Sequence, residues 1–303
     1  MTKLDLSIII VGFNTKTFLR DCLQSIKVSK RDGFNWEIIV VDNASSDDSL
    51  EMLKQEFPDV ITIANKENLG FSTANNIGVK KAKGRYVLFL NPDTILSPEA
   101  LSFMLKFMDT HPSVGVSSPR LELTSGDLDE ASHRGFPTPW NSFTHFLGLR
   151  RVFPKSKVFA GYTLGWKLED REPHEVDSVV GAFFLVRREA GEQVGWWDED
   201  YFWYGDELDF CFRLKEKGWK VYFVPQIKVL HYKGVAGGIK SHSKNISTAS
   251  IQTRIKAAKS STQAMRIFYK KHYSNKYPAP VRWLVLSGIG AIERYRTLRA
   301  RIS

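Results

Sequence analysis

The sequence predicts an α/β fold built on a mostly parallel, doubly wound sheet, and three observations support this prediction. The chain has 303 residues, of which 43% are hydrophobic and 25% charged, enough for one large α/β domain or a domain plus a smaller one. Short apolar runs typical of buried parallel strands recur between residues 7 and 118. Segments with helical periodicity separate these runs, and this alternation is typical of parallel sheets with right-handed crossovers.

The predicted strands of this first part are continuous apolar runs. They are Ser7–Val11, Glu37–Val41, Val60–Ala64, Arg85–Leu90 and Val114–Ser118. The predicted helices between them span residues 15–26, 45–57, 72–82 and 98–109. Pro58 and Gly84 end two of these helices and Pro98 opens the last, as the backbone preferences of proline and glycine predict.

The second part of the chain begins with an irregular segment. Residues 121–176 are rich in Pro, Gly, Trp and Phe, which predicts a loop region that shapes a cleft. The elements predicted after it are a strand over Val179–Arg187, a helix over Asp206–Lys217, a strand over Trp219–Val224, a helix over 245–273 and a segment over 281–301 that is apolar first and basic later. We therefore expect an α/β domain over residues 1–240, with halves 1–120 and 121–240, followed by a helical basic region over 241–303.

Cysteine usage and the apolar segments bear on the cell compartment. Cys22 and Cys211 both fall in predicted helices, and two cysteines are most simply buried apolar side chains in a reducing compartment. The first residues lack the features of a secretory signal, and no stretch reaches the ~18 apolar residues of a spanning helix. These observations predict a cytoplasmic protein.

The positive charge is concentrated at the C-terminus. The net charge is +10, but residues 228–303 contain 16 Lys or Arg and a single acid, Glu293, so the rest of the chain is slightly acidic. Such asymmetry indicates a polyanionic partner, either nucleic acid or a membrane surface. The apolar stretch Val281–Ile292, which contains Trp283, precedes four arginines: Arg294, Arg296, Arg299 and Arg301. This order suits a helix at an anionic membrane interface, and the alternative is a helix packed on the α/β domain with a solvated basic face.

Polar residues follow three of the predicted parallel strands, where ligands of open α/β sheets gather. They are Phe13-Asn14, Asp42-Asn43 and Asn91-Pro92-Asp93, with the Asn68–Gly70 turn nearby. Asp42 could accept hydrogen bonds from a nucleobase or ribose, and Asp93 is a hard oxygen ligand for Mg²⁺ or Mn²⁺. The simpler alternatives are a helix cap for Asp42 and a turn aspartate for Asp93. The glycine-rich patterns of dinucleotide-binding and P-loop proteins do not occur in the chain.

A second group of acids stands at the start of the helix predicted from Asp206. Glu207 follows a run of aromatic residues, and an apolar setting raises the pKa of a carboxylate toward that of a useful base. Asp209 and Arg213 lie one helical turn apart and should pair, which makes Asp209 structural. The alternative for the whole group is helix capping. His231, just before a glycine-rich segment, is a further candidate.

Taken together, these segments resemble the GT-A glycosyltransferase family 2, within it the bacterial rhamnosyltransferase-like branch. The matching motifs are Ser7–Asn14, Val40–Asp47, Asn68–Gly78, Leu90–Thr94, Gly181–Arg187, Asp206-Glu207 and Val229–His231. They occur in the order of the family and span about residues 7 to 238. The resemblance implies a GT-A fold, that is, a Rossmann-like and mostly parallel sheet flanked by helices, here with a C-terminal helical extension.

The resemblance also implies roles for individual residues. Those implied for the donor nucleotide are Phe13, Asn14, Asp42, Asn68, Gly70, Asn75 and Asn91. Asp93 would bind Mg²⁺ or Mn²⁺ and His231 would complete the metal site, while Asn91 stands where many relatives have aspartate. Glu207 would be the catalytic base. Because the family order is Glu-Asp and this chain has Asp-Glu, Asp206 competes for that role.

The implied activity is transfer of a sugar with inversion at the anomeric carbon. The donor would be a nucleotide sugar, dTDP-rhamnose first and a UDP-sugar as the alternative. The acceptor would be a saccharide or a polyprenyl-diphosphate-linked saccharide at the inner face of the cytoplasmic membrane, in the synthesis of a cell-surface polysaccharide. A nucleic-acid-binding protein is the alternative from another class, but the chain contains no such motif and its acidic strand ends would repel phosphate. We therefore expect no nucleic-acid partner.

Overall fold

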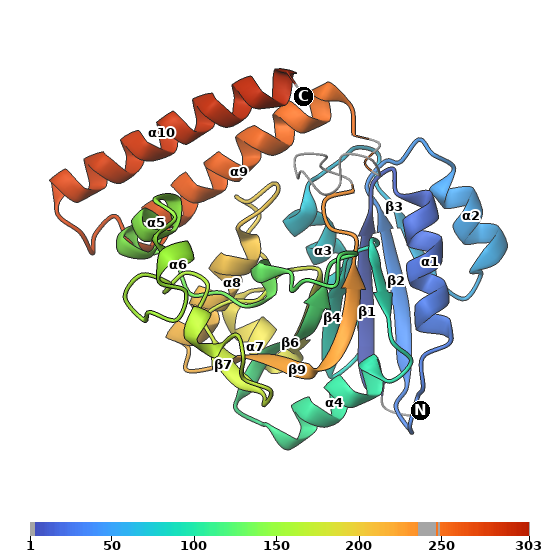
Figure 1. Ribbon diagram of the computed structural model, residues 1–303. Helices are drawn as coiled ribbons and strands as arrows, with labels where there is room; N and C mark the ends of the chain where they lie inside the picture. The colour runs from blue at the N-terminus through green and yellow to red at the C-terminus, as the bar shows by residue number, and fades with distance from the viewer. Residues whose placement is uncertain (1–3, 236–246, 248, 303) are drawn as a thin grey trace.

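The computed structural model describes residues 4–235, 247 and 249–302, and it confirms an α/β fold. Its centre is one nine-stranded sheet with helices on both faces (Figure 1). Our predicted boundary between residues 240 and 241 and the predicted helix start at 245 lie outside the described residues.

The chain alternates between strands and helices in its first part and is less regular afterwards. The strands are β1 (Leu6–Gly12), β2 (Trp36–Asp42), β3 (Ile61–Ala64), β4 (Tyr86–Leu90), β5 (Thr94–Leu96), β6 (Val114–Glu122), β7 (His174–Val176), β8 (Phe183–Arg187) and β9 (Lys220–His231). The helices are α1 (Lys16–Lys27), α2 (Ser49–Glu56), α3 (Phe71–Val79), α4 (Ala100–Thr110), α5 (Pro139–Phe146), α6 (Leu149–Val152), α7 (Arg188–Val194), α8 (Asp206–Glu216), α9 (Ile251–His272) and α10 (Ala279–Ile302), with short 3₁₀ turns at Glu130–Ser132 and Gly165–Lys167.

The sheet is parallel on one side and mixed on the other. Its strand order is β3-β2-β1-β4-β8-β6-β9-β5, and β7 pairs with β9 outside this path. Strands β1 to β4 run parallel, as predicted, whereas β8 is antiparallel to both β4 and β6. The amino end of β8 therefore lies at the same end of the sheet as the carboxyl ends of its neighbours β4 and β6 and of β1, β2 and β9. This end of the strands is at the top in Figure 1.

Three details differ from the predicted elements. β6 does not extend the parallel run, because β8 inserts between it and β4. The short strands β5 and β7 were not predicted, and residues 121–176 contain α5 and α6 as well as loops. β9 continues past Val224 to His231, because a register shift opposite Pro119 and Arg120 accommodates Pro225, which cannot donate a ladder hydrogen bond.

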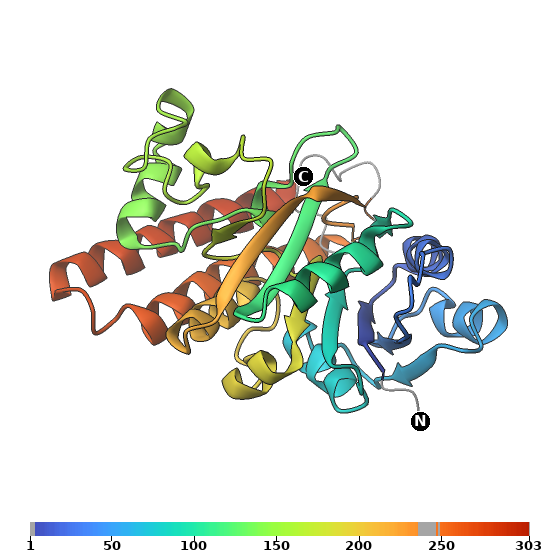
Figure 2. The same ribbon diagram turned by 90° about the horizontal axis from the view of Figure 1, so that it is seen from below.

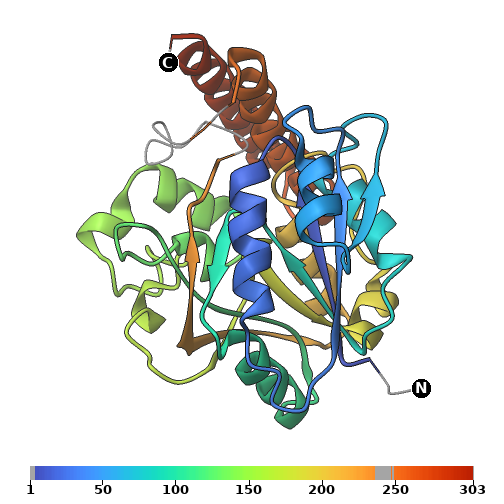
Figure 3. The ribbon, with the colours of Figure 1, turned by 90° about the vertical axis from the view of Figure 1, so that its right-hand side faces the viewer.

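Two apolar layers cover the faces of the sheet, as the pleat of the strands requires. Ile8, Ile10 and Leu88 point to one layer, with side chains of α1, α2 and α4. Ile9 and Phe89 point to the other, with side chains of α3, α7 and α8. Figure 3 shows α1 across the front of the sheet. Cys22 and Cys211 are buried free thiols in these layers, as predicted.

The C-terminal helices form a hairpin at the upper edge of the sheet. α9 packs on α8 through a small aromatic cluster that includes Phe212, Phe268 and Tyr273. α10 lies along α9, and both Figure 1 and Figure 2 place α5 beside this hairpin. Trp283 and Leu284 of α10 remain exposed. None of the described helices is long and apolar enough to cross a membrane.

Candidate active site

The polar strand ends open into one large cavity of about 1370 Å³. Its lining includes Asn91 and Asp93 after β4, the Asn68–Gly70 turn, Asp206 and Glu207 at the start of α8, and His231 at the end of β9. Two acidic groups that are far apart in the sequence, Asp93 and the Asp206-Glu207 pair, thus face the same space.

Asp93 and His231 are brought together by the pairing of β5 with β9. Thr94 is opposite His231 in this antiparallel ladder, and the amide of Tyr232 donates to the Asp93 carbonyl at 3.0 Å. The His231 Nε2 atom lies 3.4 Å from Asp93 Oδ1. Among the described residues this buried nitrogen has no hydrogen-bond partner, and a cation beside the Asp93 carboxylate would bind it in place of its proton.

The other ring nitrogen of His231 is held by Asp129, a residue that the sequence did not indicate. His231 Nδ1 lies 2.9 Å from Asp129 Oδ2, and the Lys233 ammonium pairs with the other oxygen of this fully buried carboxylate. Although burial disfavours the charged imidazole, Asp93 and Asp129 raise the pKa of His231 to about 9. A carboxylate behind a histidine is the usual arrangement in metal sites, where it orients the ring toward the cation.

The donor set of this part of the site suits a divalent cation that keeps other ligands. Carboxylate oxygen and imidazole nitrogen are both ligands of Mn²⁺-type ions. Within the described part of the chain, no group of three or more His, Cys, Asp or Glu side chains is placed to hold a metal. Asp93 and His231 could therefore supply two ligands, and the remainder would have to come from substrate oxygens and water.

Four of the seven residues implied for nucleotide binding line the cavity: Phe13, Asn68, Gly70 and Asn91. Gly70 has a φ of +85°, and a Cβ atom there would lie 2.6 Å from the Phe202 carbonyl oxygen. Phe71 also donates its amide to that oxygen. A glycine is therefore required where the turn meets the loop that leads into α8.

The remaining three residues, Asn14, Asp42 and Asn75, are not part of the cavity lining. Asp42 is buried and its Oδ2 accepts from the Ser45 amide at 2.9 Å. Asn14 accepts from the Ser46 amide, and Asn75 donates to the Phe71 carbonyl. Each of these side chains has a bond that shapes a loop or helix end beside the cavity.

Asp206 and Glu207 differ sharply in environment. Glu207 Oε1 accepts from Arg134 Nη2 at 2.7 Å, and the Glu207 side chain is 13% exposed. Burial opposes ionisation of Glu207, but the Arg134 guanidinium outweighs it and lowers the pKa of this carboxyl. For Asp206, burial and the neighbouring Glu207 carboxylate raise the pKa well above its usual value. The surroundings therefore favour the ionised form of Glu207 and the protonated form of Asp206.

Arg134 and two tyrosines complete this side of the cavity, and the sequence analysis did not identify them. The pKa of Arg134 is raised despite burial, because Tyr162 and Glu207 favour its charged form. Tyr204 is half-buried, and desolvation of its hydroxyl, together with the nearby charges of Glu207 and Asp93, raises the pKa of that hydroxyl. Arg134 lies in the irregular segment that we predicted to shape a cleft. Asp209, by contrast, pairs with Arg213 as predicted and also with His272.

Comparison with known proteins identifies the family. Residues 7–195 match Glycosyl transferase family 2, and residues 161–254 match Glycosyl transferase family group 2. The chain belongs to glycosyl transferase family 2. This family 2 enzyme is therefore a glycosyltransferase, as the sequence motifs indicated.

Two relatives of the family 2 enzyme are rhamnosyltransferases. It is 28% identical over 278 residues to the N-acetylglucosaminyl-diphospho-decaprenol L-rhamnosyltransferase of Mycobacterium tuberculosis, covering 88% of this chain and 84% of that protein. It is 26% identical over 234 residues to the rhamnosyltransferase WbbL of Escherichia coli, covering 74% of this chain and 82% of the relative. The similarity supports membership of the rhamnosyltransferase-like branch.

Solved structures show the same fold at low identity. GalNAc-T7 with UDP, GalNAc and Mn²⁺ superposes with a TM-score of 0.58 at 15% identity, covering 91% of this chain and 52% of that chain. The mannosyltransferase PcManGT of Pyrobaculum calidifontis with GDP-Man and Mn²⁺ gives a TM-score of 0.56 at 16% identity, covering 99% of this chain and 74% of that one. Both are glycosyltransferases, and the expected GT-A architecture is confirmed.

Proposed function

We propose that this enzyme transfers a sugar, rhamnose from dTDP-rhamnose, with inversion onto a saccharide carried by a lipid diphosphate. The observation that supports it best is the pairing of Glu207 with Arg134 on the wall of the cavity that also contains Asp93 and His231. The rhamnosyltransferases named above, one of which acts on an N-acetylglucosaminyl-diphospho-decaprenol, support the choice of donor sugar and acceptor. A UDP-sugar donor is the alternative.

Glu207 is the base in this proposal. An inverting displacement needs a carboxylate that takes the proton of the acceptor hydroxyl as the oxygen attacks the anomeric carbon. Both acids line the cavity, but the pKa of Glu207 is lowered, whereas Asp206 is almost fully buried and its pKa is raised. The more readily ionised acid is the better proton acceptor, which favours Glu207 although the order of the two acids is reversed relative to the family.

Asp93 and His231 are the proposed holders of Mg²⁺ or Mn²⁺. When bound, the cation would neutralise negative charge on the nucleoside diphosphate leaving group. The chain's own contribution is positional: Asp129 holds the His231 ring so that Nε2 faces Asp93. Phe13, Asn68, Gly70 and Asn91 are proposed to contact the nucleotide directly, and Asn14, Asp42 and Asn75 to shape the loops behind it.

The same proposal places the enzyme at an anionic membrane surface on the cytoplasmic side. A lipid-linked acceptor remains in the bilayer, so the active site must reach it there. The basic C-terminal helices, with exposed Trp283 and Leu284 on α10, support this location. We also propose that residues 1–240 form the domain that transfers the sugar and that residues 241–303 dock it on the membrane.

Replacing Glu207 by Gln tests the proposal directly. We expect Glu207→Gln to lower kcat by about 10³-fold or more, because the amide cannot take a proton, while the calorimetric affinity for dTDP-rhamnose with Mn²⁺ stays within about twofold. The anomeric configuration of the wild-type product is read by NMR. Wild-type turnover in the variant, or a product with retained configuration, would contradict the proposal. A larger thermal shift of the wild-type enzyme with UDP-sugars than with dTDP-rhamnose would indicate that the donor is a UDP-sugar.

A further inference from the structure

The cavity continues well past the acids, into a part that donor binding does not use. There its walls are α5, α9 and α10, and their side chains are mostly apolar. The apolar side chains on these walls include Trp140, Phe143, Phe146, Leu284, Ile289 and Ile292. Ile289 is buried, whereas Phe143 and Leu284 are 53% and 62% exposed, so this part of the cavity opens at an apolar rim.

Two arginines line the same part of the cavity without a carboxylate partner among the described residues. Arg296 of α10 has one hydrogen bond, to Ser261 Oγ at 2.9 Å, and no ion pair in the described part of the chain. Arg254 of α9 has a buried Nε atom for which the described residues provide no partner. A desolvated guanidinium without a counter-ion is costly and is usually matched by an anion when the site is filled.

Arg296 lies near the acids and on the helix that also carries part of the apolar wall, and Arg254 lines the same cavity. Tyr204 lies within electrostatic range of both Glu207 and Arg296, and Tyr162 lies within range of both Arg134 and Arg296. Burial also lowers the pKa of Arg296, and Tyr162 and Tyr204 offset this effect only in part. Moving outward from Glu207, a ligand would therefore meet cationic side chains first and an apolar groove next.

We propose that this half of the cavity binds an isoprenyl diphosphate, with Arg254 and Arg296 on the diphosphate and the walls of α5 and α10 on the hydrocarbon chain. The inference rests on the proposed function, because the ligand would be the carrier of the acceptor sugar, and it adds where the carrier lies. The order of groups agrees with such a molecule: the sugar at Glu207, its diphosphate beside the arginines, and the chain leaving through the exposed rim toward the bilayer. A soluble oligosaccharide would need neither the apolar exit nor these two arginines, for which the described residues provide no carboxylate.

Calorimetry without catalysis tests this site. The probes are farnesyl diphosphate, kept below its micelle concentration, and inorganic diphosphate, both in EDTA so that no metal recruits diphosphate to the donor side. We expect farnesyl diphosphate to bind at least about tenfold more tightly than inorganic diphosphate, because burying several methylene groups is favourable. Arg296→Gln should lower the affinity for both probes, because both contain the diphosphate.

Matched variants separate the groove from general surface effects. Leu284 and Leu298 are both on α10 and are 62% and 60% exposed, but only Leu284 lines the cavity. Leu284→Ser should weaken the binding of farnesyl diphosphate about fivefold and leave the affinity for inorganic diphosphate unchanged, because only an apolar contact is lost. Leu298→Ser should change neither affinity. Phe143→Ser and Phe153→Ser form a second pair of this kind, because Phe153 is similarly exposed outside the cavity lining.

Equal affinity for the two probes, or equal effects of Leu284→Ser and Leu298→Ser, would overturn the inference. Neither result depends on sugar transfer, so failure here is distinguishable from failure of the proposed function. Absence of transfer to any acceptor, together with the expected binding pattern, would leave the lipid site standing and remove only the proposed reaction.

Discussion

At the scale of single residues, the chemistry of the site depends on how differently two adjacent acids ionise. Asp206 and Glu207 have the same kind of side chain and neighbouring positions, yet the pKa of one is raised and that of the other lowered. The difference comes from Arg134, which pairs with Glu207 and not with Asp206. Arg134 is thus a positioning residue that keeps the proposed base ionised.

The role of Arg134 is visible in a pH profile. Removing the cation in Arg134→Gln should raise the pKa of Glu207, because burial then acts without compensation. A base is active when deprotonated, so the acid limb of log(kcat/KM) should move to higher pH, by about one unit or more. Arg134→Lys, which keeps the charge, serves as the control and should restore most of the wild-type limb. An unshifted limb in Arg134→Gln would mean that Glu207 is not the titrating base.

Asp129 offers a second residue-scale prediction, on the metal side. Asp129→Asn should weaken Mn²⁺-dependent donor binding by about 10- to 100-fold, because the amide no longer fixes the His231 ring as the carboxylate does. Calorimetric titration of nucleotide with and without Mn²⁺ measures the effect. Asp127→Asn, an exposed neighbour outside the cavity lining, is the matched control. Equal donor affinities of the two variants would show that Asp129 has only a structural role.

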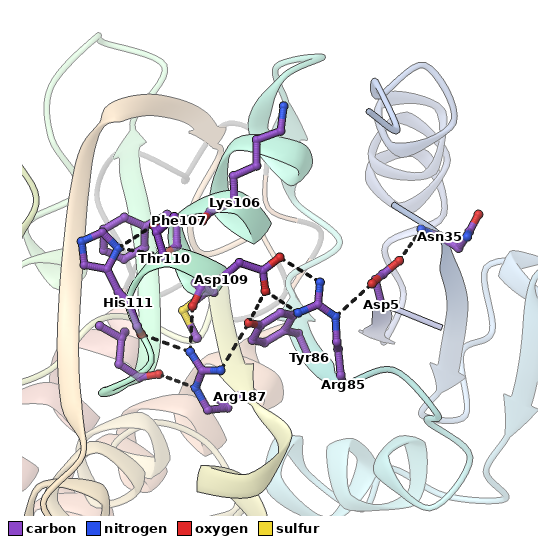
Figure 4. A network of polar contacts seen from close by, with 12 residues as sticks. Asp5, Asn35, Arg85, Tyr86, Lys106, Phe107, Asp109, Thr110, His111 and Arg187 are labelled. Carbon is purple, nitrogen blue, oxygen red and sulfur yellow. Dashed lines mark hydrogen bonds and ion pairs between the residues drawn. The ribbon is translucent and has the colours of Figure 1, made fainter. Parts of the chain in front are cut away.

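At the scale of elements, the end of the sheet opposite the cavity is held by a polar network between β4, β8 and α4 (Figure 4). Arg187 at the end of β8 donates to the carbonyls of Met108, His111 and Val114. Arg85 forms ion pairs with Asp109 and Asp5, and the Tyr86 hydroxyl donates to Asp109 at 2.7 Å. The network fixes α4 against the strands whose other ends carry the site.

This network predicts part of the acid sensitivity of the fold. Arg85 lowers the pKa of Asp109 in the folded state. A group with a lowered folded pKa stabilises the protein above its unfolded value and loses that contribution as the pH falls through its folded pKa. Urea titrations should therefore show Asp109→Asn less stable than wild type at pH 7, with the difference shrinking below about pH 4. Asp59→Asn, on an exposed turn, should show no such trend. A gap between Asp109→Asn and wild type that is constant with pH would exclude an ionic origin.

At the scale of the whole molecule, the α9–α10 hairpin joins the transferase cavity to a basic and partly apolar surface. α9 is anchored on α8 by aromatic packing, and α10 packs along α9. α10 nevertheless exposes Trp283 and Leu284, so packing on the α/β domain and contact with a membrane are compatible. The hairpin can therefore present the cavity to a bilayer.

Flotation with vesicles tests this arrangement of the whole molecule. The enzyme should float with phosphatidylglycerol-containing vesicles at low salt and much less in 0.5 M salt, about where surface charges are screened. Trp283→Ser should reduce flotation further, and Val28→Ser, equally exposed at the end of α1, should not. No flotation at low salt would argue against membrane docking by this surface.

Local patterns were sufficient for the strand and helix alternation of residues 6–110 and for Asp93, Glu207 and His231 as candidates. They were insufficient for β5, β7 and the full length of β9. β5 and β7 have only three residues each, too few to show an alternation of apolar and polar side chains. Pro225 predicts the end of a strand, and β9 continues past it only because of the register shift against β6. Long-range pairing decides such elements.

The sequence by itself thus determined the family, the parallel half of the sheet and the acids at the strand ends. Buried parallel strands and family motifs each consist of consecutive residues, so local sequence patterns are enough to find them. Only the tertiary structure decided which of the two acids ionises more readily and what orients His231. Arg134 meets Glu207 across 73 residues of sequence, and Asp129 meets His231 across 102. Contacts of this separation depend on strand order and register, and the charges they bring together set each pKa, so no local pattern contains them.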